Sequence, residues 1–134
     1  THKNYMFTAE DVIAAHSKVK SGADFPKYIQ EIKELGVKNY EVFVADGRSV
    51  YYGDNNHKAE VAPKYSTQQI APQVDKSTFT DQLKAHQQGK TDYLTFIKMC
   101  AKTGIEKWEI VMEAMTCTYF DKDGNEILVE TIPG

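Results

Sequence analysis

Hydrophobic residues along the chain pass from helical spacing to strand spacing in two separate stretches. Between residues 24 and 36 they fall at i, i+1, i+4 and i+7, which is one face of an amphipathic helix: Tyr28, Ile29, Ile32 and Leu35. From residue 39 they alternate with polar residues, which predicts a strand with one buried face. The same change recurs between residues 92 and 112. Each stretch therefore predicts a helix followed by a strand.

Start and stop signals for helices flank these stretches. Thr8 is a good N-cap for an earlier helix over AEDVIAAHSKVK, and Asp24 and Asp92 are expected to cap the helices that follow. Gly36 and Gly104 come directly after the last helical position, where a residue in the left-handed conformation commonly ends a helix. We therefore expect a positive φ at both glycines.

Turn signals divide the strands. The pair Asp46-Gly47 predicts a tight hairpin turn, and DKDGN at residues 121–125 predicts a turn before a last strand. The second stretch has MEAMT where the first has its Asp-Gly pair, which leaves the position of that turn open. We expect two to three strands after each pair of helices.

Two segments of the chain have similar sequences. VKNYEVFV at residues 37–44 and IEKWEIVM at residues 105–112 lie 68 positions apart. The same offset aligns residues of one chemical kind: Gly36 with Gly104, Tyr40 with Trp108, and Glu41 with Glu109. Similarity at a fixed offset indicates a duplicated unit, here over about residues 7–62 and 77–132.

Helices grouped before strands, rather than alternating with them, predict an α+β fold. We expect a two-layer sandwich in which helices cover one face of an antiparallel sheet, built from two repeated ααββ(β) units with pseudo-twofold symmetry. Residues 54–76 connect the units, and Val61 and Ile70 suggest short edge strands there. This connection is too apolar for a free linker, so residues 1–134 are expected to form a single domain.

Composition and charge narrow the class of protein. Hydrophobic residues make up 41% of the chain and charged residues 26%, as in globular proteins. The net charge is −3 without a basic stripe, so neither nucleic acid nor a membrane is the expected partner. No apolar run approaches a membrane span, and the N-terminus shows no apolar signal region. Cys100 and Cys117 fit no disulfide framework, which favours reduced thiols and a cytoplasmic location.

Three segments together resemble one known family: SKVKSGADFPKYIQEIKELGVKNYEVFVADGRSVYYG, LKAHQQGKTDY and EKWEIVMEAMTCTYFDKDGNEILVE. They are similar to the DUF1398 family, which includes the YdfO and YbcV proteins of enterobacteria, over about residues 7–132. The resemblance implies an α+β fold and a bacterial, often prophage, origin, sometimes with the label of a phage envelope protein. It implies no catalytic residues, cofactor or substrate.

His16 and His86 stand in matching Ala-His pairs near the ends of the first helix of each unit. A symmetric pair of histidines suits acid/base chemistry or metal binding, because histidine titrates near neutral pH. A histidine is also favourable at a helix C-terminus for electrostatic reasons. No second His or Cys stands at metal-ligand spacing, so we expect no metal and no cofactor and favour the structural interpretation.

Glu41 and Glu109 are carboxylates at matching strand positions. Alternation places both on the helix-free face of the sheet, whereas Tyr40 and Trp108 are expected to face the helices. Two close carboxylates suit general acid/base catalysis. Glutamates are also ordinary residues on a sheet face that is exposed to water. We favour this structural interpretation, because the sequence pattern shows no cause for a perturbed pKa.

The helix-free face also holds Phe43 and Val111. A face that meets only water would favour polar residues, so this mixture predicts a partly buried contact. Two coverings fit equally well, namely a second copy of the chain in a twofold dimer or the connecting segment folded over the face. Tyr51 and Tyr119 are further candidates that could line a ligand groove, although tyrosine is equally common in strands.

Two classes of function fit these residues. The first is a non-enzymatic binding or protein-interaction module that acts through its sheet surface, with an unidentified protein or small molecule as its partner. The second is a small enzyme with an acid/base site in a cleft at the pseudo-twofold axis. The chain has no P-loop, GxGxxG, GxSxG or HExxH motif. The sequence therefore favours the binding module.

Overall fold

The computed structural model describes residues 6–19 and 24–132. Over these residues, two helices precede three strands twice along the chain. The first group contains α1 (Ala9–His16), α2 (Phe25–Glu34), β1 (Asn39–Phe43), β2 (Ser49–Tyr52), the short 3₁₀ helix η2 (Asp54–Asn56) and β3 (Lys58–Val61). The second contains α3 (Lys76–Gln87), α4 (Tyr93–Lys102), β4 (Lys107–Val111), β5 (Thr116–Phe120) and β6 (Glu126–Thr131). The predicted α+β class is confirmed.

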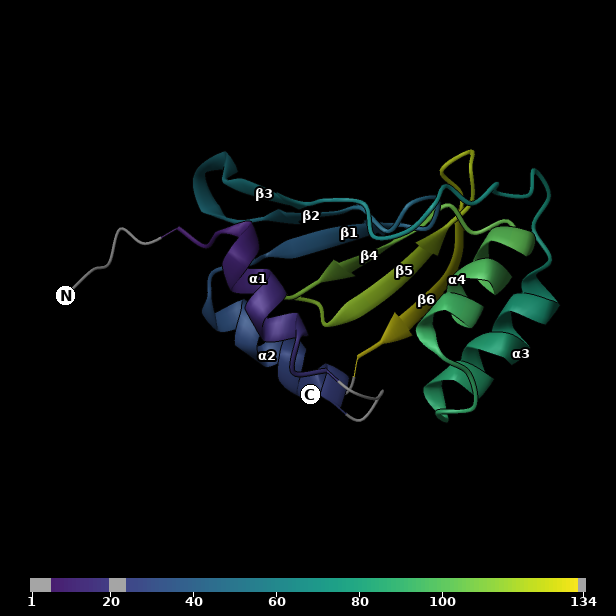
Figure 1. Cartoon of the computed structure of the whole chain (residues 1–134), viewed down its shortest axis with the longest axis horizontal. Coiled ribbons are helices and arrows are strands. Elements are labelled where there is room, and N and C mark those ends of the chain that lie inside the picture. The colour runs from purple at the N-terminus through teal and green to yellow at the C-terminus, as the bar shows by residue number, and fades with distance from the viewer. Residues whose placement is uncertain (1–5, 20–23, 133–134) are drawn as a thin grey trace.

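The six described strands form one open antiparallel sheet in the order β3-β2-β1-β4-β5-β6 (Figure 1). β1 and β4 pair at its centre, so the first group supplies one half of the sheet and the second group supplies the other. Their register places Glu41 directly opposite Glu109. The two glutamates are therefore neighbours at the midline of the sheet.

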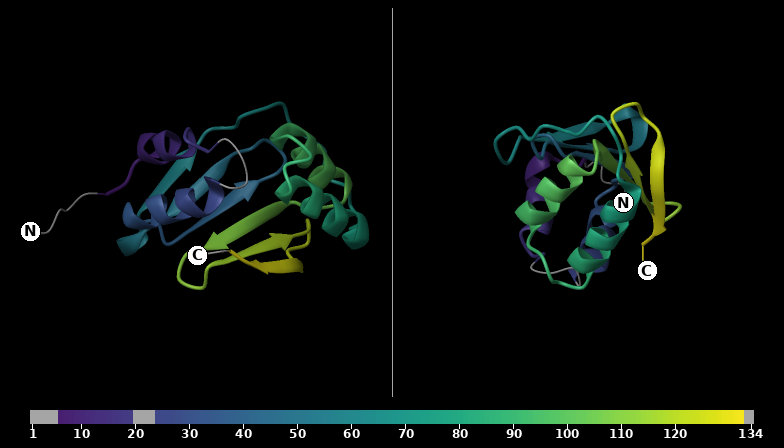
Figure 2. Two further views of the ribbon diagram at one scale, coloured as in Figure 1. Left: turned by 90° about the horizontal axis from the view of Figure 1, so that it is seen from below. Right: turned by 90° about the vertical axis from the view of Figure 1, so that its right-hand side faces the viewer.

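The helices lie together on one side of the sheet, with α1 and α2 towards one end and α3 and α4 towards the other (Figures 1 and 2). Ring contacts join them to that face: Tyr28 to Tyr40 with 6.4 Å between centroids, Phe96 to Trp108 with 5.9 Å, and Phe79 to Tyr119 with 5.0 Å. The prediction that Tyr40 and Trp108 face the helices is confirmed. The opposite face of the sheet carries no helix among the described residues.

The core fills the space between the helices and the sheet. Its fully buried side chains come from both groups of elements, among them Ile29, Ile97, Ile110 and Phe79. Burying a side chain of this size contributes about 1.5–3 kcal/mol. The core therefore holds the two groups of elements together on the helix side.

The two stop glycines behave as predicted. Gly36 has a φ of +105° and Gly104 a φ of +88°, and each follows directly after the last turn of a helix. In both cases the next residue donates its N–H back into the helix, from Val37 to the Ile32 carbonyl and from Ile105 to the Cys100 carbonyl. This satisfies carbonyls that the helix end would leave unpaired.

The helix starts agree with the prediction only in part. Thr8 and Asp11 form a reciprocal capping box at α1, and the Asp92 carboxylate accepts a hydrogen bond from the Thr95 N–H at 2.8 Å. Asp24 occupies the N-cap position of α2 but makes no capping hydrogen bond to the helix. Pro26 at the start of α2 lacks an N–H, so this helix has fewer donors to satisfy.

The first helix is shorter than predicted. α1 ends at His16, while the pattern extended it to Lys20, which lies outside the described residues. The Ser17 hydroxyl donates to the Ala14 carbonyl at 2.6 Å, and serine that bonds the local backbone in this way competes with continued helix.

The connecting segment runs across the end of the sheet. Its Lys64 N–H donates to the Asp46 carbonyl in the turn after β1, and its Ala71 N–H donates to the Ala101 carbonyl of α4, both at 2.8 Å. Val61 ends the edge strand β3, as predicted, but Ile70 lies in no strand and packs its side chain into the core. These contacts lie on the helix side and at the sheet end, so the connection does not cover the helix-free face.

Candidate functional site

The centre of the helix-free face is built by strand alternation. Because Tyr40 and Trp108 face the helices, their neighbours Glu41 and Glu109 point to the other side of the sheet. Val50 lies beside Glu41 on the next strand outward. We call the surface around the two glutamates the open face.

Glu41 is fully engaged by its neighbours. Its carboxylate accepts a hydrogen bond from the Tyr52 hydroxyl at 2.9 Å and forms an ion pair with the Lys107 ammonium group. Only 16% of its side chain is exposed. Burial raises the pKa of Glu41, but the hydrogen bonds from Lys107 and Tyr52 and the charges of Lys107 and Arg48 outweigh it, and the net pKa is lowered. Glu41 is therefore held as a carboxylate at neutral pH.

Glu109 has a different set of partners. Its carboxylate accepts one hydrogen bond from the Asn39 side-chain amide, at 3.2 Å. Within the described part of the chain, no cationic group lies within ion-pair distance of it. The two glutamates are thus adjacent in the sheet but unequal in their electrostatic surroundings.

Apolar side chains surround the glutamates on the open face. Phe43, Val111 and Phe120 are half-buried, and Val129 on the edge strand is 51% exposed. The Arg48 guanidinium lies 4.3 Å from the centre of the Phe43 ring. The predicted row of mixed apolar and acidic residues is therefore present on this face.

The two histidines lie on the helix side and pack against aromatic rings. His16 contacts the Tyr28 ring edge-on at 5.3 Å between centroids, and His86 stacks on Phe96 at 4.3 Å. Burial lowers the pKa of both imidazoles. The Lys64 charge lowers the pKa of His16 further, while Thr91 and Asp92 partly oppose the effect at His86. Each histidine thus has a structural partner of its own.

Tyr51 and Tyr119 are both buried on the helix side. The Tyr51 hydroxyl lies 2.9 Å from the Tyr28 hydroxyl, and its ring stacks on Tyr40 with 4.6 Å between centroids. Tyr119 donates to Glu130 at 3.3 Å. Tyr119 therefore belongs to the core and not to an exposed groove, whereas Tyr51 also reaches the floor of a surface cleft.

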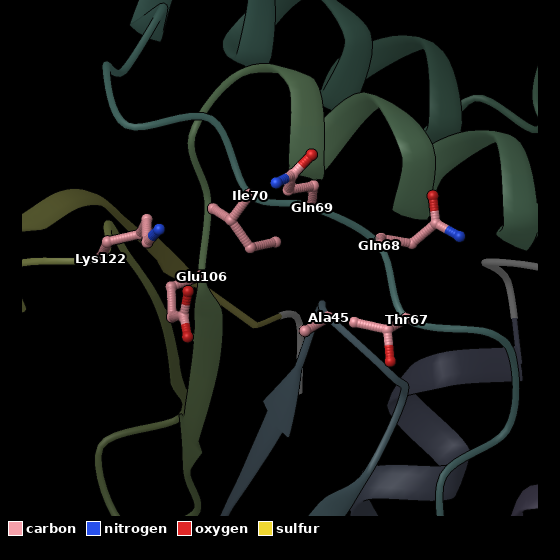
Figure 3. A pocket seen from close by; sticks show the side chains of 7 residues that line it. All are labelled: Ala45, Thr67, Gln68, Gln69, Ile70, Glu106 and Lys122. Carbon is pink, nitrogen blue, oxygen red and sulfur yellow. The ribbon is translucent and has the colours of Figure 1, made fainter.

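Two cavities lie away from the glutamate pair. One, of about 470 Å³, opens at the end of the sheet, and Figure 3 shows the side chains around it: Ala45, Thr67, Gln68, Gln69, Ile70, Glu106 and Lys122. The other, of about 330 Å³, lies beside α1 and is lined by Val12, Ile13, His16, Ser17, Tyr51, Val61 and Lys64. The second cavity brings together two residues that the sequence had singled out separately, His16 and Tyr51.

Metal and thiol chemistry find no support in the arrangement of the side chains. Within residues 6–19 and 24–132, no three His, Cys, Asp or Glu side chains are placed to hold a metal ion. Cys100 and Cys117 are free and buried. Burial raises the pKa of both thiols, that of Cys117 to about 12, so both stay protonated and unreactive. None of the described helices is long and apolar enough to cross a membrane.

The sequence did not reveal the partners that define each candidate. Tyr52 and Lys107 outweigh burial and lower the pKa of Glu41, and the charge of Lys64 adds to burial in lowering the pKa of His16. Lys107 stands two positions before Glu109, so alternation alone puts it on the open face. Its pairing with Glu41 depends on the register between β1 and β4, which no local pattern specifies.

Comparison with known proteins gives one clear result. A family described as a protein of unknown function, DUF1398, matches residues 13–131. A search of curated proteins finds no match to the chain.

Proposed function

Because the chain belongs to the DUF1398 family of proteins of unknown function, its activity has to be argued from its own surfaces, and we propose that it is a non-enzymatic interaction module. Its contact surface is the open face of the sheet. The observation that carries this proposal is the row of half-exposed apolar side chains around Glu41 and Glu109 on a face without helices.

The apolar side chains argue for a contact rather than for a solvated face. Phe43, Val111, Phe120 and Val129 come from four different strands, so the apolar area is spread across the sheet. Removing apolar surface from water contributes about 25 cal/mol of binding free energy per Å², and apolar surface that stays in water contributes none. Apolar side chains that together form a contiguous patch commonly mark an interaction site, and the proposal requires that these side chains form one.

The alternative, an enzyme that uses the two glutamates, fits less well. A general base works best with a pKa near the working pH, and the pKa of Glu41 is shifted in the opposite direction by Lys107 and Tyr52. An active site also needs a cleft over the reacting groups. Neither of the two cavities is lined by Glu41 or Glu109.

We further propose that the two halves of the sheet derive from one duplicated unit with pseudo-twofold symmetry. The order of elements repeats along the chain, and the strand order reads outward from β1 and β4 in the same way on both sides. A twofold axis through the midline would exchange Glu41 with Glu109, which are direct partners in the register. These observations support the duplication.

The partner that fits the open face is a second copy of the chain. Glu109 on this face has no cationic partner among the described residues. Arg48 is a base at the rim of the face, and its side chain is 38% exposed and lies 3.5 Å from Glu60. In a twofold dimer, Glu109 of one copy would pair with Arg48 of the other, and the symmetry would form this pair twice. A closed dimer would also cover the apolar side chains of both copies at once.

Analytical ultracentrifugation of three proteins tests this proposal. The wild type is expected to sediment as a dimer, and Phe43→Lys as a folded monomer, because a buried unpaired charge is costly at an interface. Leu94→Lys is the matched control, since Leu94 is 51% exposed on α4, away from the open face, and this variant should remain a dimer. A monomeric wild type, or a dimeric Phe43→Lys protein, would contradict the dimer.

A further inference from the structure

The second cavity, beside α1, has the make-up of a small-molecule site. Its floor consists of the buried side chains of Val12, Tyr51 and Val61, and its rim holds the exposed residues Ile13 and His16. Lys64 and Ser17 complete the rim. A volume of about 330 Å³ with an apolar floor and few polar groups is typical of sites for small ligands. We call this cavity the α1 cleft.

Lys64 supplies the charge at the rim, and no acidic residue belongs to the described lining of the cleft. Within the part of the chain that the structure describes, no carboxylate lies within ion-pair distance of the Lys64 ammonium group. Lys64 is an exposed residue, yet partial burial lowers the pKa of its ammonium group, and its charge in turn lowers the pKa of His16. The cleft thus holds one ammonium group beside an imidazole that can donate a hydrogen bond, and within the described residues no carboxylate pairs with that ammonium group.

We propose that the α1 cleft binds a small organic carboxylate with an aliphatic chain. The carboxylate pairs with the Lys64 ammonium group and accepts a hydrogen bond from the His16 ring, while the chain lies on Val12, Val61 and the Tyr51 ring. A ligand of this kind supplies the missing negative charge and covers the exposed Ile13 side chain, which is 50% accessible.

The apolar floor selects the class of anion. A phosphate has a doubly charged head with strong hydration, and it needs several donors to replace its water. The cleft offers one ammonium group and one imidazole, while the Ser17 hydroxyl already donates to the Ala14 carbonyl. A monoanionic carboxylate needs fewer donors, and its chain gains free energy from the apolar floor.

This site is separate from the open face. Tyr51 projects to the helix side of β2, where its hydroxyl meets Tyr28 of α2, and the dimer surface proposed above lies on the other side of the sheet. Binding in the cleft and association through the open face can therefore be tested independently.

Titration of hexanoate into the ¹⁵N-labelled full chain, followed by NMR, tests the proposal. Hexanoate should shift the amide signals of the cleft residues in a saturable way, while hexanamide and hexylammonium, which lack the negative charge, should bind at least about tenfold more weakly. Lys64→Met should weaken hexanoate binding by about tenfold. Lys58→Met removes an exposed lysine from the neighbouring part of β3 and should leave binding unchanged.

The variants also keep a folding defect apart from a binding defect. Lys64 is on the surface, and circular dichroism should show Lys64→Met and Lys58→Met folded like the wild type. Ile13→Ser, also at an exposed position, should weaken hexanoate binding while leaving the preference for hexanoate over hexylammonium intact. The absence of saturable hexanoate shifts, equal binding of hexylammonium, or unchanged binding to Lys64→Met would each overturn the proposal.

Discussion

The two halves of the sheet place a glutamate at the same point and surround it differently. Glu41 in β1 contacts Lys107 and Tyr52, whereas Glu109 in β4 has Asn39 as its one hydrogen-bond partner among the described residues. At an offset of 68 residues, Lys107 corresponds to Asn39, and Phe120 stands where the other half has Tyr52. The order of strands is similar in the two halves, but the groups that contact the glutamate are not.

Part of the difference arises because each glutamate takes one partner from the other half of the chain. Lys107 of β4 reaches Glu41 of β1, and Asn39 of β1 reaches Glu109 of β4. Glu109 therefore has an amide where Glu41 has an ammonium group, and the phenylalanine at position 120 gives it no hydroxyl to match that of Tyr52. Local sequence patterns determine where the strands lie, and contacts across the midline of the sheet determine which groups pair with each glutamate.

The stop glycines show the same contrast in packing. A Cβ atom on Gly36 would meet only Phe7, at 3.8 Å, whereas a Cβ atom on Gly104 would lie 2.7 Å from the Gln73 carbonyl oxygen and 3.0 Å from the Val74 Cα atom. The connecting segment passes over the end of α4, whereas Phe7 is the described residue nearest to a Cβ atom on Gly36 at the end of α2. Similar backbone angles thus stand in different surroundings.

The largest expected effect is a difference between alanine substitutions at these two glycines. Gly36→Ala should lower the free energy of unfolding by about 1–2 kcal/mol, the cost of a left-handed residue that carries a Cβ atom. Gly104→Ala should cost about 1–3 kcal/mol more, because its Cβ atom meets rigid backbone. Urea unfolding of both variants measures the difference. Equal losses would show that the connecting segment moves aside freely.

Much of the fold follows from local signals. The helix stripe around Ile29, the stop at Gly36 and the alternation around Tyr40 each predict the observed element, because spacing and φ preference act within a few residues. The faces of β1 and β4 follow from the same alternation. The path of Ile70 does not, since it depends on packing into the core with distant residues. The end of α1 is local, but the bond from the Ser17 hydroxyl to the Ala14 carbonyl leaves no trace in the hydrophobic spacing.

The sequence could identify the residues of the candidate site and the face on which they lie, but not their partners. Glu41 and Glu109 are visible in the sequence as matching acids, and their position on one face follows from alternation. Their unequal partners depend on the β1–β4 register, and the α1 cleft depends on how residue 64 returns to α1. Both are long-range contacts, which a local pattern does not encode.

An intermediate effect on the free energy of unfolding is expected at the buried pair of Tyr28 and Tyr51, for which the second half has no equivalent among the described residues. Phe96 stands at the position that matches Tyr28, so the hydroxyl contact of 2.9 Å between Tyr28 and Tyr51 occurs only in the first half. Tyr28→Phe should lower the free energy of unfolding by about 1–2 kcal/mol, because it leaves the buried Tyr51 hydroxyl without this partner.

The double variant Tyr28→Phe/Tyr51→Phe separates the hydrogen bond from ring packing. Removing both hydroxyls should recover most of the loss, since no buried polar atom then lacks this contact. Thermal or urea unfolding of the two single variants and the double variant completes the cycle. Additive losses would contradict a direct coupling between the two hydroxyl groups.

The smallest expected effect concerns the pH dependence of the glutamate pair. The folded pKa of Glu41 lies below its ordinary value of 4.5, so ionised Glu41 stabilises the fold above that pH and loses this contribution as the pH falls through the folded pKa. Glu41→Gln should therefore be less stable than the wild type at pH 7 by about 1 kcal/mol. The two proteins should converge in stability below the folded pKa of Glu41.

Glu109→Gln is the matched control for this comparison. It removes a carboxylate that has an amide partner and no cation, so its stability at pH 7 should stay within about 0.5 kcal/mol of the wild type. Lys107→Met should reproduce the loss seen in Glu41→Gln, and combining the two should add little, because both break the same ion pair. Urea unfolding of these variants from pH 3 to pH 8 measures all the differences. If Glu109→Gln changes the pH dependence of stability in acid as much as Glu41→Gln does, the two glutamates are electrostatically equivalent and the proposed contrast between them is wrong.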